Sequence, residues 1–79
     1  MPKLISMRSV ELIKFLESQG FIVDRQKGSH VVLVRQLNTS KQVLTIPNHK
    51  EIDIGTTKAI YNQSKKFIDE EVLHSFFYK

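Results

Sequence analysis

The sequence predicts an α+β fold in the order helix, three strands, helix and short C-terminal helix. Three observations support this prediction. All three glycines of the 79-residue chain fall between periodic segments. Apolar residues follow a helical spacing before Gly20, whereas β-branched residues dominate between Gly20 and Pro47. One sheet and two main helices form a single core only if both helices cover the same face, so we expect a three-stranded antiparallel sheet with one open face.

The first helix is predicted to end at Gly20. Its apolar positions have the i, i+3, i+4 spacing of a core-facing helix: Leu12, Phe15 and Leu16. Ser6 or Ser9 is expected to supply the hydroxyl that caps its N-terminus. Gly20 suits the left-handed position that follows a last helical turn, and Phe21 then begins the first strand.

Three short strands are predicted to follow as an antiparallel meander. The β-branched and apolar runs cover residues 21–23, 30–35 and 42–46. Gly28 marks the first turn, residues 38–40 mark the second, and Pro47 ends the third strand because it cannot donate to a ladder. Alternation places His30 and Val31 on opposite faces of the second strand, and the pattern alone leaves open which face the helices cover.

Two helices are predicted to complete the chain. Thr56 or Thr57 is expected to cap a helix that runs to about Phe67. Asp69 then begins a short last helix, because acidic residues suit a helix N-terminus. The apolar positions of this helix are Val72, Leu73, Phe76 and Phe77. The aromatic run at 76–78 exceeds what the helix needs for its own burial, so it either completes the core or contributes to a partner surface.

Length and composition limit the function. At 79 residues we expect one domain, residues 1–79, with a shallow surface that favours a polymeric substrate over a small metabolite. The chain has no cysteine and its three histidines lack the close spacing of metal ligands, so we expect no disulfide and no metal site. No run approaches the ~20 apolar residues of a membrane helix, and the start lacks an apolar signal core. We therefore expect a cytoplasmic protein without a membrane segment.

The formal net charge of +4 is concentrated in the middle of the chain. Residues 21–50 hold five basic side chains against Asp24 alone, which gives +4, whereas residues 1–20 contribute +1 and residues 51–79 contribute −1. Three lysines share a side of the predicted second helix: Lys58, Lys65 and Lys66. Basic surfaces of this kind suit the phosphates of nucleic acid. A solvated, solubilising face is the alternative.

His30 is the candidate for acid–base chemistry, because it lies where the turn Lys27-Gly28-Ser29 meets the second strand. Cleavage of RNA needs a base for the 2′-hydroxyl proton and an acid for the leaving oxygen, and the ordinary histidine pKa of about 6.5 suits both tasks. Lys27 and the backbone amides of Gly28 and Ser29 are candidates to bind the phosphate. A structural histidine at the start of a strand is the alternative. Ser29 is a weak candidate for a nucleophile, since no acid is placed to orient a histidine beside it.

His49 is an auxiliary candidate. It follows the third strand, whose end pairs with the start of the second strand in an antiparallel meander. This register is expected to place His49 near His30, which makes the two histidines candidates for an acid–base pair. An exposed loop histidine is the alternative reading of His49. His74 is assigned no role.

Four motifs stand in order along the chain: Gly20-Phe21, Arg25-Gln26-Lys27-Gly28-Ser29-His30, Ile46-Pro47-Asn48-His49 and Gly55-Thr56. From Leu12 to about Phe67 the chain therefore resembles the HicA toxin family, the small mRNA-cleaving partners of HicB antitoxins. Six consecutive identities with flanking elements in the right order make the resemblance specific. Val31 departs from the family pattern, in which a polar or aromatic residue often follows the histidine.

The resemblance implies an α-β-β-β-α fold similar to that of double-stranded-RNA-binding domains. It implies an endoribonuclease that arrests translation by cleaving mRNA, with the histidine of the Gly-Ser-His motif, here His30, as the catalytic group. It also implies that no metal or cofactor is needed and that a HicB-like antitoxin blocks the active surface. We therefore expect the toxin of a type II toxin–antitoxin system. A non-catalytic RNA-binding module of the same fold is the main alternative, and a protein that acts through contacts of residues 76–78 is a third.

Overall fold

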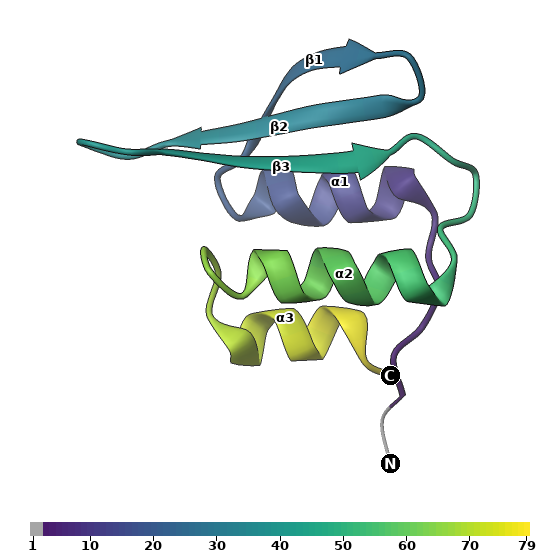
Figure 1. Ribbon diagram of the computed structural model, residues 1–79. Coiled ribbons are helices and arrows are strands. Elements are labelled where there is room, and N and C mark those ends of the chain that lie inside the picture. The colour runs from purple at the N-terminus through teal and green to yellow at the C-terminus, as the bar shows by residue number, and fades with distance from the viewer. Residues whose placement is uncertain (1–2) are drawn as a thin grey trace.

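The computed structural model describes residues 3–79 and confirms the predicted α+β class and the order of the elements. These are α1 (Ser9–Ser18), β1 (Ile22–Lys27), β2 (His30–Gln36), β3 (Lys41–Pro47), α2 (Ile54–Ser64) and α3 (Glu70–Phe77). The strands form one sheet in the order β1-β2-β3, and both pairs are antiparallel (Figure 1). The predicted meander is therefore confirmed. Within the described residues no helix is long and apolar enough to span a membrane.

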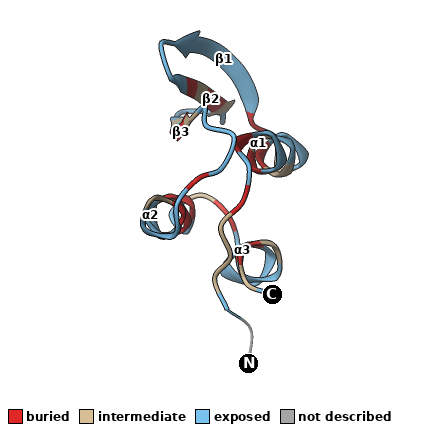
Figure 2. Ribbon diagram, turned by 90° about the vertical axis from the view of Figure 1, so that its right-hand side faces the viewer, coloured by how far each residue is buried: buried red, intermediate tan, exposed pale blue. Residues whose placement is uncertain are grey.

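The helices lie below the sheet in two layers (Figures 1 and 2). Helix α1 packs against one face of the sheet, α2 lies alongside β3, and α3 packs against α2. The covered face carries two cross-strand pairs of buried residues: Val31 with Ile46 and Leu33 with Leu44. Because side chains alternate along a strand, His30 and Thr45 lie on the opposite face. The question that the pattern left open is thus answered, and His30 belongs to the open face.

Helix α1 ends as predicted but begins differently. Gly20 has a φ of +96°, its N–H donates to the carbonyl of Glu17, and the N–H of Phe21 donates to the carbonyl of Leu16. These two bonds are those of a Schellman C-terminus. The N-cap, however, is Arg8 and neither Ser6 nor Ser9.

The hydroxyl of Ser9 is used elsewhere, which explains the difference. Ser9 is 5% exposed, and its Oγ donates to Oδ1 of Asn48 over 3.4 Å. Glu11 supplies a cap instead, since its carboxylate accepts the backbone N–H of Arg8 at 3.3 Å. The first turn of α1 is therefore tied to the segment that follows β3.

Helix α2 is capped by Asp53, so the prediction of a cap at Thr56 or Thr57 was wrong. The Asp53 carboxylate accepts both the N–H of Thr56 at 3.1 Å and its hydroxyl at 2.7 Å. Thr57 is buried and its hydroxyl donates to the carbonyl of Asp53. The helix ends at Ser64, before Phe67, and a turn follows.

The aromatic run at 76–78 completes the core. Phe77 is fully buried and lies edge-on to Phe15 and Tyr61, with ring centroids 6.2 and 5.3 Å apart. Phe76 stacks on Phe15 at 4.1 Å, and Tyr78 packs against Tyr61. Of the two roles considered for these rings, burial accounts for Phe77 fully and for its two neighbours in part. As predicted, the short helix begins at an acidic N-cap, Asp69.

Candidate active site and nucleic-acid interface

A tight turn holds His30 at the start of β2. Lys27 and His30 are direct partners across β1 and β2, so Gly28 and Ser29 form a two-residue hairpin turn. Gly28 has a φ of +59° and Ser29 does not have a positive φ, the combination that a type II′ turn requires. The predicted glycine turn therefore has a geometric reason, because only glycine adopts this conformation without strain.

The sheet register places one cation beside His30. Direct cross-strand partners point to the same face, with Cβ atoms about 5 Å apart. Lys27 is the partner of His30 on β1, and Pro47 is its partner on β3. All three residues therefore form one row across the open face. His30 and Lys27 are exposed, and the Oγ of Ser29 lies 3.5 Å from Nδ1 of His30.

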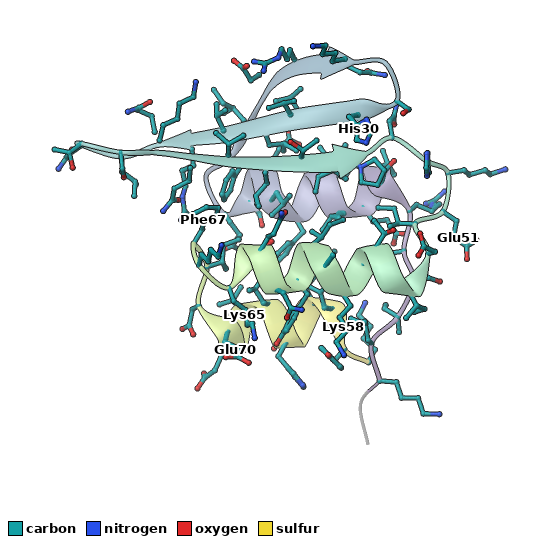
Figure 3. The ribbon with its side chains drawn as sticks, in the orientation of Figure 1. His30, Glu51, Lys58, Lys65, Phe67 and Glu70 are labelled. Atoms are coloured by element: carbon teal, nitrogen blue, oxygen red, sulfur yellow. The ribbon has the colours of Figure 1, made fainter. Side chains whose placement is uncertain are left out.

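His30 and His49 open onto the same cleft, which has a volume of about 430 Å³. This histidine cleft lies between β3 and α2. Its walls consist of His30, Thr45, Pro47, His49, Thr56, Ala59, Ile60 and Gln63. Figure 3 shows His30 at the start of β2, above α2. The register argument thus brought together two histidines that are separated by 19 positions in the sequence.

Three hydrogen bonds fix the backbone around both histidines. The N–H of Asn48 donates to the carbonyl of Ser29 at 2.6 Å. The N–H of Ser9 donates to the carbonyl of His49 at 3.3 Å, and the Ser9 hydroxyl donates to the Asn48 side chain. The start of α1, the turn before His30 and the segment after β3 are therefore joined at one point.

Among the residues that line the histidine cleft, the two histidines are the only titratable ones. None of its eight lining residues is a carboxylate. Asp53, the N-cap of α2, does not line the cleft. Hydrogen bonds from Thr56 hold the pKa of the Asp53 carboxyl below the ordinary value of 3.8. Within residues 3–79 no group of three or more His, Cys, Asp or Glu side chains is placed to hold a metal ion.

The three lysines predicted for the second helix do not share one surface: Lys58 lies on α2, whereas Lys65 and Lys66 lie in the turn after its end at Ser64. Lys66 lines a smaller hollow of about 130 Å³ between β3 and α2, together with Val43, Leu44, Gln63 and Phe67. Lys58 and Lys65 point away from the sheet (Figure 3), and Nζ of Lys65 lies 5.6 Å from the centre of the Tyr61 ring. Only Lys66 of the three is therefore on the side of α2 that carries the histidine cleft.

Sequence reasoning missed three polar residues on this side. Thr45 and Gln63 line the histidine cleft. Arg25 pairs with Val32 in the register, so it lies on the open face two positions before Lys27. The alternation of strand residues was a usable signal for Arg25 and Thr45. Gln63 had no such signal, because its position depends on how α2 packs against β3.

Comparison with known families gives one match. Residues 9–65 match the family described as HicA toxin of bacterial toxin-antitoxin. The curated proteins and the solved structures give no match. The matched segment contains α1, the whole sheet and α2, and therefore every residue that lines the histidine cleft.

Proposed function

This chain belongs to the HicA toxin family of bacterial toxin–antitoxin systems, and from this premise we propose that it is an mRNA-cleaving endoribonuclease in which His30 moves a proton. The observation that supports the proposal is that His30 and His49 line one cleft free of carboxylates. Two imidazoles that face one cleft supply the two proton transfers that RNA cleavage needs.

In the proposed reaction the 2′-hydroxyl of the RNA attacks the adjacent phosphorus. One histidine takes the hydroxyl proton while the O2′–P bond forms. The other gives a proton to the 5′-oxygen as the P–O5′ bond breaks, so the products are a 2′,3′-cyclic phosphate and a 5′-hydroxyl. His30 is one of these groups and His49 is the candidate for the other. Neither step uses a metal or cofactor.

Lys27 and the turn before His30 are proposed to hold the reacting phosphate. Lys27 is the direct partner of His30 across the sheet. An ammonium group at this place stabilises the negative charge that develops on the phosphate oxygens in the transition state. The backbone amides of Gly28 and Ser29 are adjacent candidates for the same oxygens.

As a member of a toxin–antitoxin pair, the protein has an antitoxin partner. We expect this partner to be HicB-like and to act by covering the histidine cleft, which would place both proteins in the cytoplasm with their mRNA target. A reading frame for a HicB-like protein next to this gene, and relief of growth arrest on its co-expression, would support this assignment.

The decisive experiment is RNA cleavage in the presence of EDTA by purified wild type and by three matched variants: His30→Ala, His49→Ala and His74→Ala. His74 lies on α3, outside the cleft, and stacks on Tyr78. We expect His30→Ala to abolish cleavage, His49→Ala to slow it by about 10²–10⁴-fold, and His74→Ala to have no effect. Circular dichroism shows whether each variant is folded.

Two results would overturn the proposal. Equal cleavage by wild type and folded His30→Ala would exclude His30 as a catalytic residue. Salt-dependent RNA binding by a wild type that never cleaves RNA would favour the non-catalytic RNA-binding module.

A further inference from the structure

The histidine cleft continues along the molecule. The smaller hollow at Lys66 shares Gln63 with the histidine cleft, and both lie between β3 and α2. On β3 the histidine cleft is lined by Thr45 and Pro47, and the smaller hollow is lined by Val43 of the same strand face and by its neighbour Leu44. Together the two hollows form a groove, called here the β3–α2 groove, with the histidines at one end and Lys66 at the other.

The length of the groove matches a short stretch of nucleic acid. Val43 and Pro47 are four residues apart on β3, which corresponds to about 13 Å at the rise of an antiparallel strand. One strand of a double helix advances about 3.4 Å per nucleotide, and an unstacked single strand is more extended. The groove therefore accommodates at most about four nucleotides beside the reacting phosphate.

The walls of the groove combine a cation, polar groups and apolar surface. The ammonium of Lys66 makes no ion pair within the described part of the chain. Gln63 lies midway and offers an amide with both donors and an acceptor. Val43 is 46% exposed and Phe67 is half-buried, so apolar surface is available at the same end.

This combination favours an unpaired RNA strand over a duplex. In an A-form duplex the base faces are stacked, and proteins contact mainly phosphates and 2′-hydroxyls across a wide surface. Apolar walls and a central amide would have little to contact there. An unpaired strand presents base faces, base edges and phosphates together.

We propose that the β3–α2 groove binds single-stranded RNA next to the scissile phosphate. Lys66 contacts a flanking backbone phosphate, and Gln63 contacts the nucleotide that lies between this phosphate and the scissile one. This proposal rests on the ribonuclease function proposed above. It assigns binding roles to Lys66 and Gln63 and none to Lys58 or Lys65, which point away from the sheet.

The test measures binding separately from cleavage. All variants are made in a His30→Ala background, so that the RNA is not cleaved during the measurement. Fluorescence anisotropy then measures the Kd for a labelled mixed-sequence ribo-oligonucleotide of about eight nucleotides and for the matching duplex. Both are measured over a range of KCl concentrations. Lys66→Ala and Gln63→Ala are compared with Lys58→Ala and Lys65→Ala. Lys65→Ala is the closest control, because it removes the same kind of side chain one residue away in the turn that follows α2. Thermal melting confirms that each variant is folded.

We expect Lys66→Ala to raise the Kd for the single strand about fivefold or more. It should also reduce the slope of log K against log salt by about 0.7, because one phosphate contact on a single strand contributes that amount. Gln63→Ala should raise the Kd with an unchanged slope. Lys58→Ala and Lys65→Ala should leave both quantities within experimental error.

The proposal fails if Lys58→Ala or Lys65→Ala weakens binding as much as Lys66→Ala does, if Lys66→Ala has no effect, or if the duplex binds more tightly than the single strand. These outcomes differ from failure of the proposed function, which would appear in the cleavage assay as a wild type that never cleaves RNA or as cleavage of the RNA by the folded His30→Ala protein. A gel of the same samples shows whether the RNA is intact.

Discussion

The backbone N–H of Asn48 donates a 2.6 Å hydrogen bond to the carbonyl of Ser29, one position beyond the last register pair of β2 and β3. Ser29 precedes His30 in the chain, and Asn48 precedes His49. The two histidines of the cleft are therefore positioned by adjacent backbone groups that are directly bonded to each other. A change in the turn at Gly28 should reach both side chains.

Gly28→Ala is expected to destabilise the protein and to slow RNA cleavage. Gly28 has a φ of +59°, and a Cβ added there would meet no atom within 4 Å, so the cost is backbone strain alone. That strain amounts to about 1–3 kcal/mol for an L-residue held in a sparsely populated region of φ/ψ space. Urea denaturation measures the loss of stability, and initial rates of cleavage measure the displacement of His30.

Thr39→Ala is the control for this prediction, because Thr39 lies in the other turn of the sheet, between β2 and β3. It should leave the cleavage rate unchanged. A Gly28→Ala protein with wild-type stability and rate would show that the turn does not need a positive φ.

Asp53 is expected to make the stability of α2 depend on acid pH. Hydrogen bonds from Thr56 lower the pKa of Asp53 in the folded state below its ordinary value of 3.8. The unfolded chain therefore binds the proton at a higher pH than the folded chain does, and stability falls as the pH falls. The contribution is complete above about pH 5 and is lost as the pH drops through the lowered folded pKa.

Asp53→Asn tests this prediction, since asparagine keeps the capping oxygen but does not titrate. Thermal melting between about pH 2 and pH 6 should show a smaller loss of Tm in the variant than in wild type. Parallel curves for the two proteins would contradict the prediction. Glu11 also has a lowered pKa through its bond to Arg8, but it contributes equally to both curves.

Local pattern was sufficient for the elements of the fold and insufficient for the details that build the site. The glycine breaks and the alternation of strand residues correctly predicted a meander with His30 at the start of β2. The N-caps predicted for α1 and α2 were wrong, because the sequence pattern does not distinguish the hydroxyls of Ser9 and Thr56 from the carboxylates of Glu11 and Asp53, which accept the first-turn hydrogen bonds instead. Which polar group caps a helix depends on what else that group can bond, and Ser9 bonds Asn48.

The lysines of α2 show a second limit. Helix α2 ends at Ser64, and Lys65 and Lys66 lie in the turn that follows, so the helical spacing that placed them on one side with Lys58 does not extend to them. Periodicity predicted a basic side for this helix, but it does not say which edge of that side meets the groove. That choice follows from the packing of α2 against β3, which no local pattern contains.

Arg35 is expected to be the most important charged residue for stability. Its guanidinium joins three parts of the chain, donating to the carbonyl of Gln19 at 2.8 Å, to the carbonyl of Phe67 at 2.5 Å and to Oε1 of Gln42 at 2.7 Å. It also lies 4.8 Å above the ring of Phe21. Arg35→Ala removes all of these contacts, and we expect a loss of about 2–4 kcal/mol in the free energy of unfolding.

Urea denaturation of three variants measures this effect. Arg35→Lys keeps the charge but cannot reach three acceptors, so it should lie between wild type and Arg35→Ala. Arg25→Ala removes an exposed arginine from the neighbouring strand, where its pair with Asp24 is on the surface, and should cost at most about 1 kcal/mol. Equal losses for Arg25→Ala and Arg35→Ala would show that the contacts of Arg35 with the two carbonyls add nothing to stability.

Phe77→Ala distinguishes a core role for the C-terminal aromatic run from a partner surface. Phe77 is 0% exposed and contacts Phe15 and Tyr61, so truncation should leave a cavity that costs about 3–5 kcal/mol. Val72→Ala, at a position 38% exposed on the same helix, should change stability by less than about 0.5 kcal/mol. Urea denaturation of both variants, together with antitoxin binding measured under conditions in which each is folded, separates the two roles. A Phe77→Ala protein with wild-type stability but no affinity for the antitoxin would show that the aromatic run at 76–78 is a partner surface and that Phe77 is not part of the core.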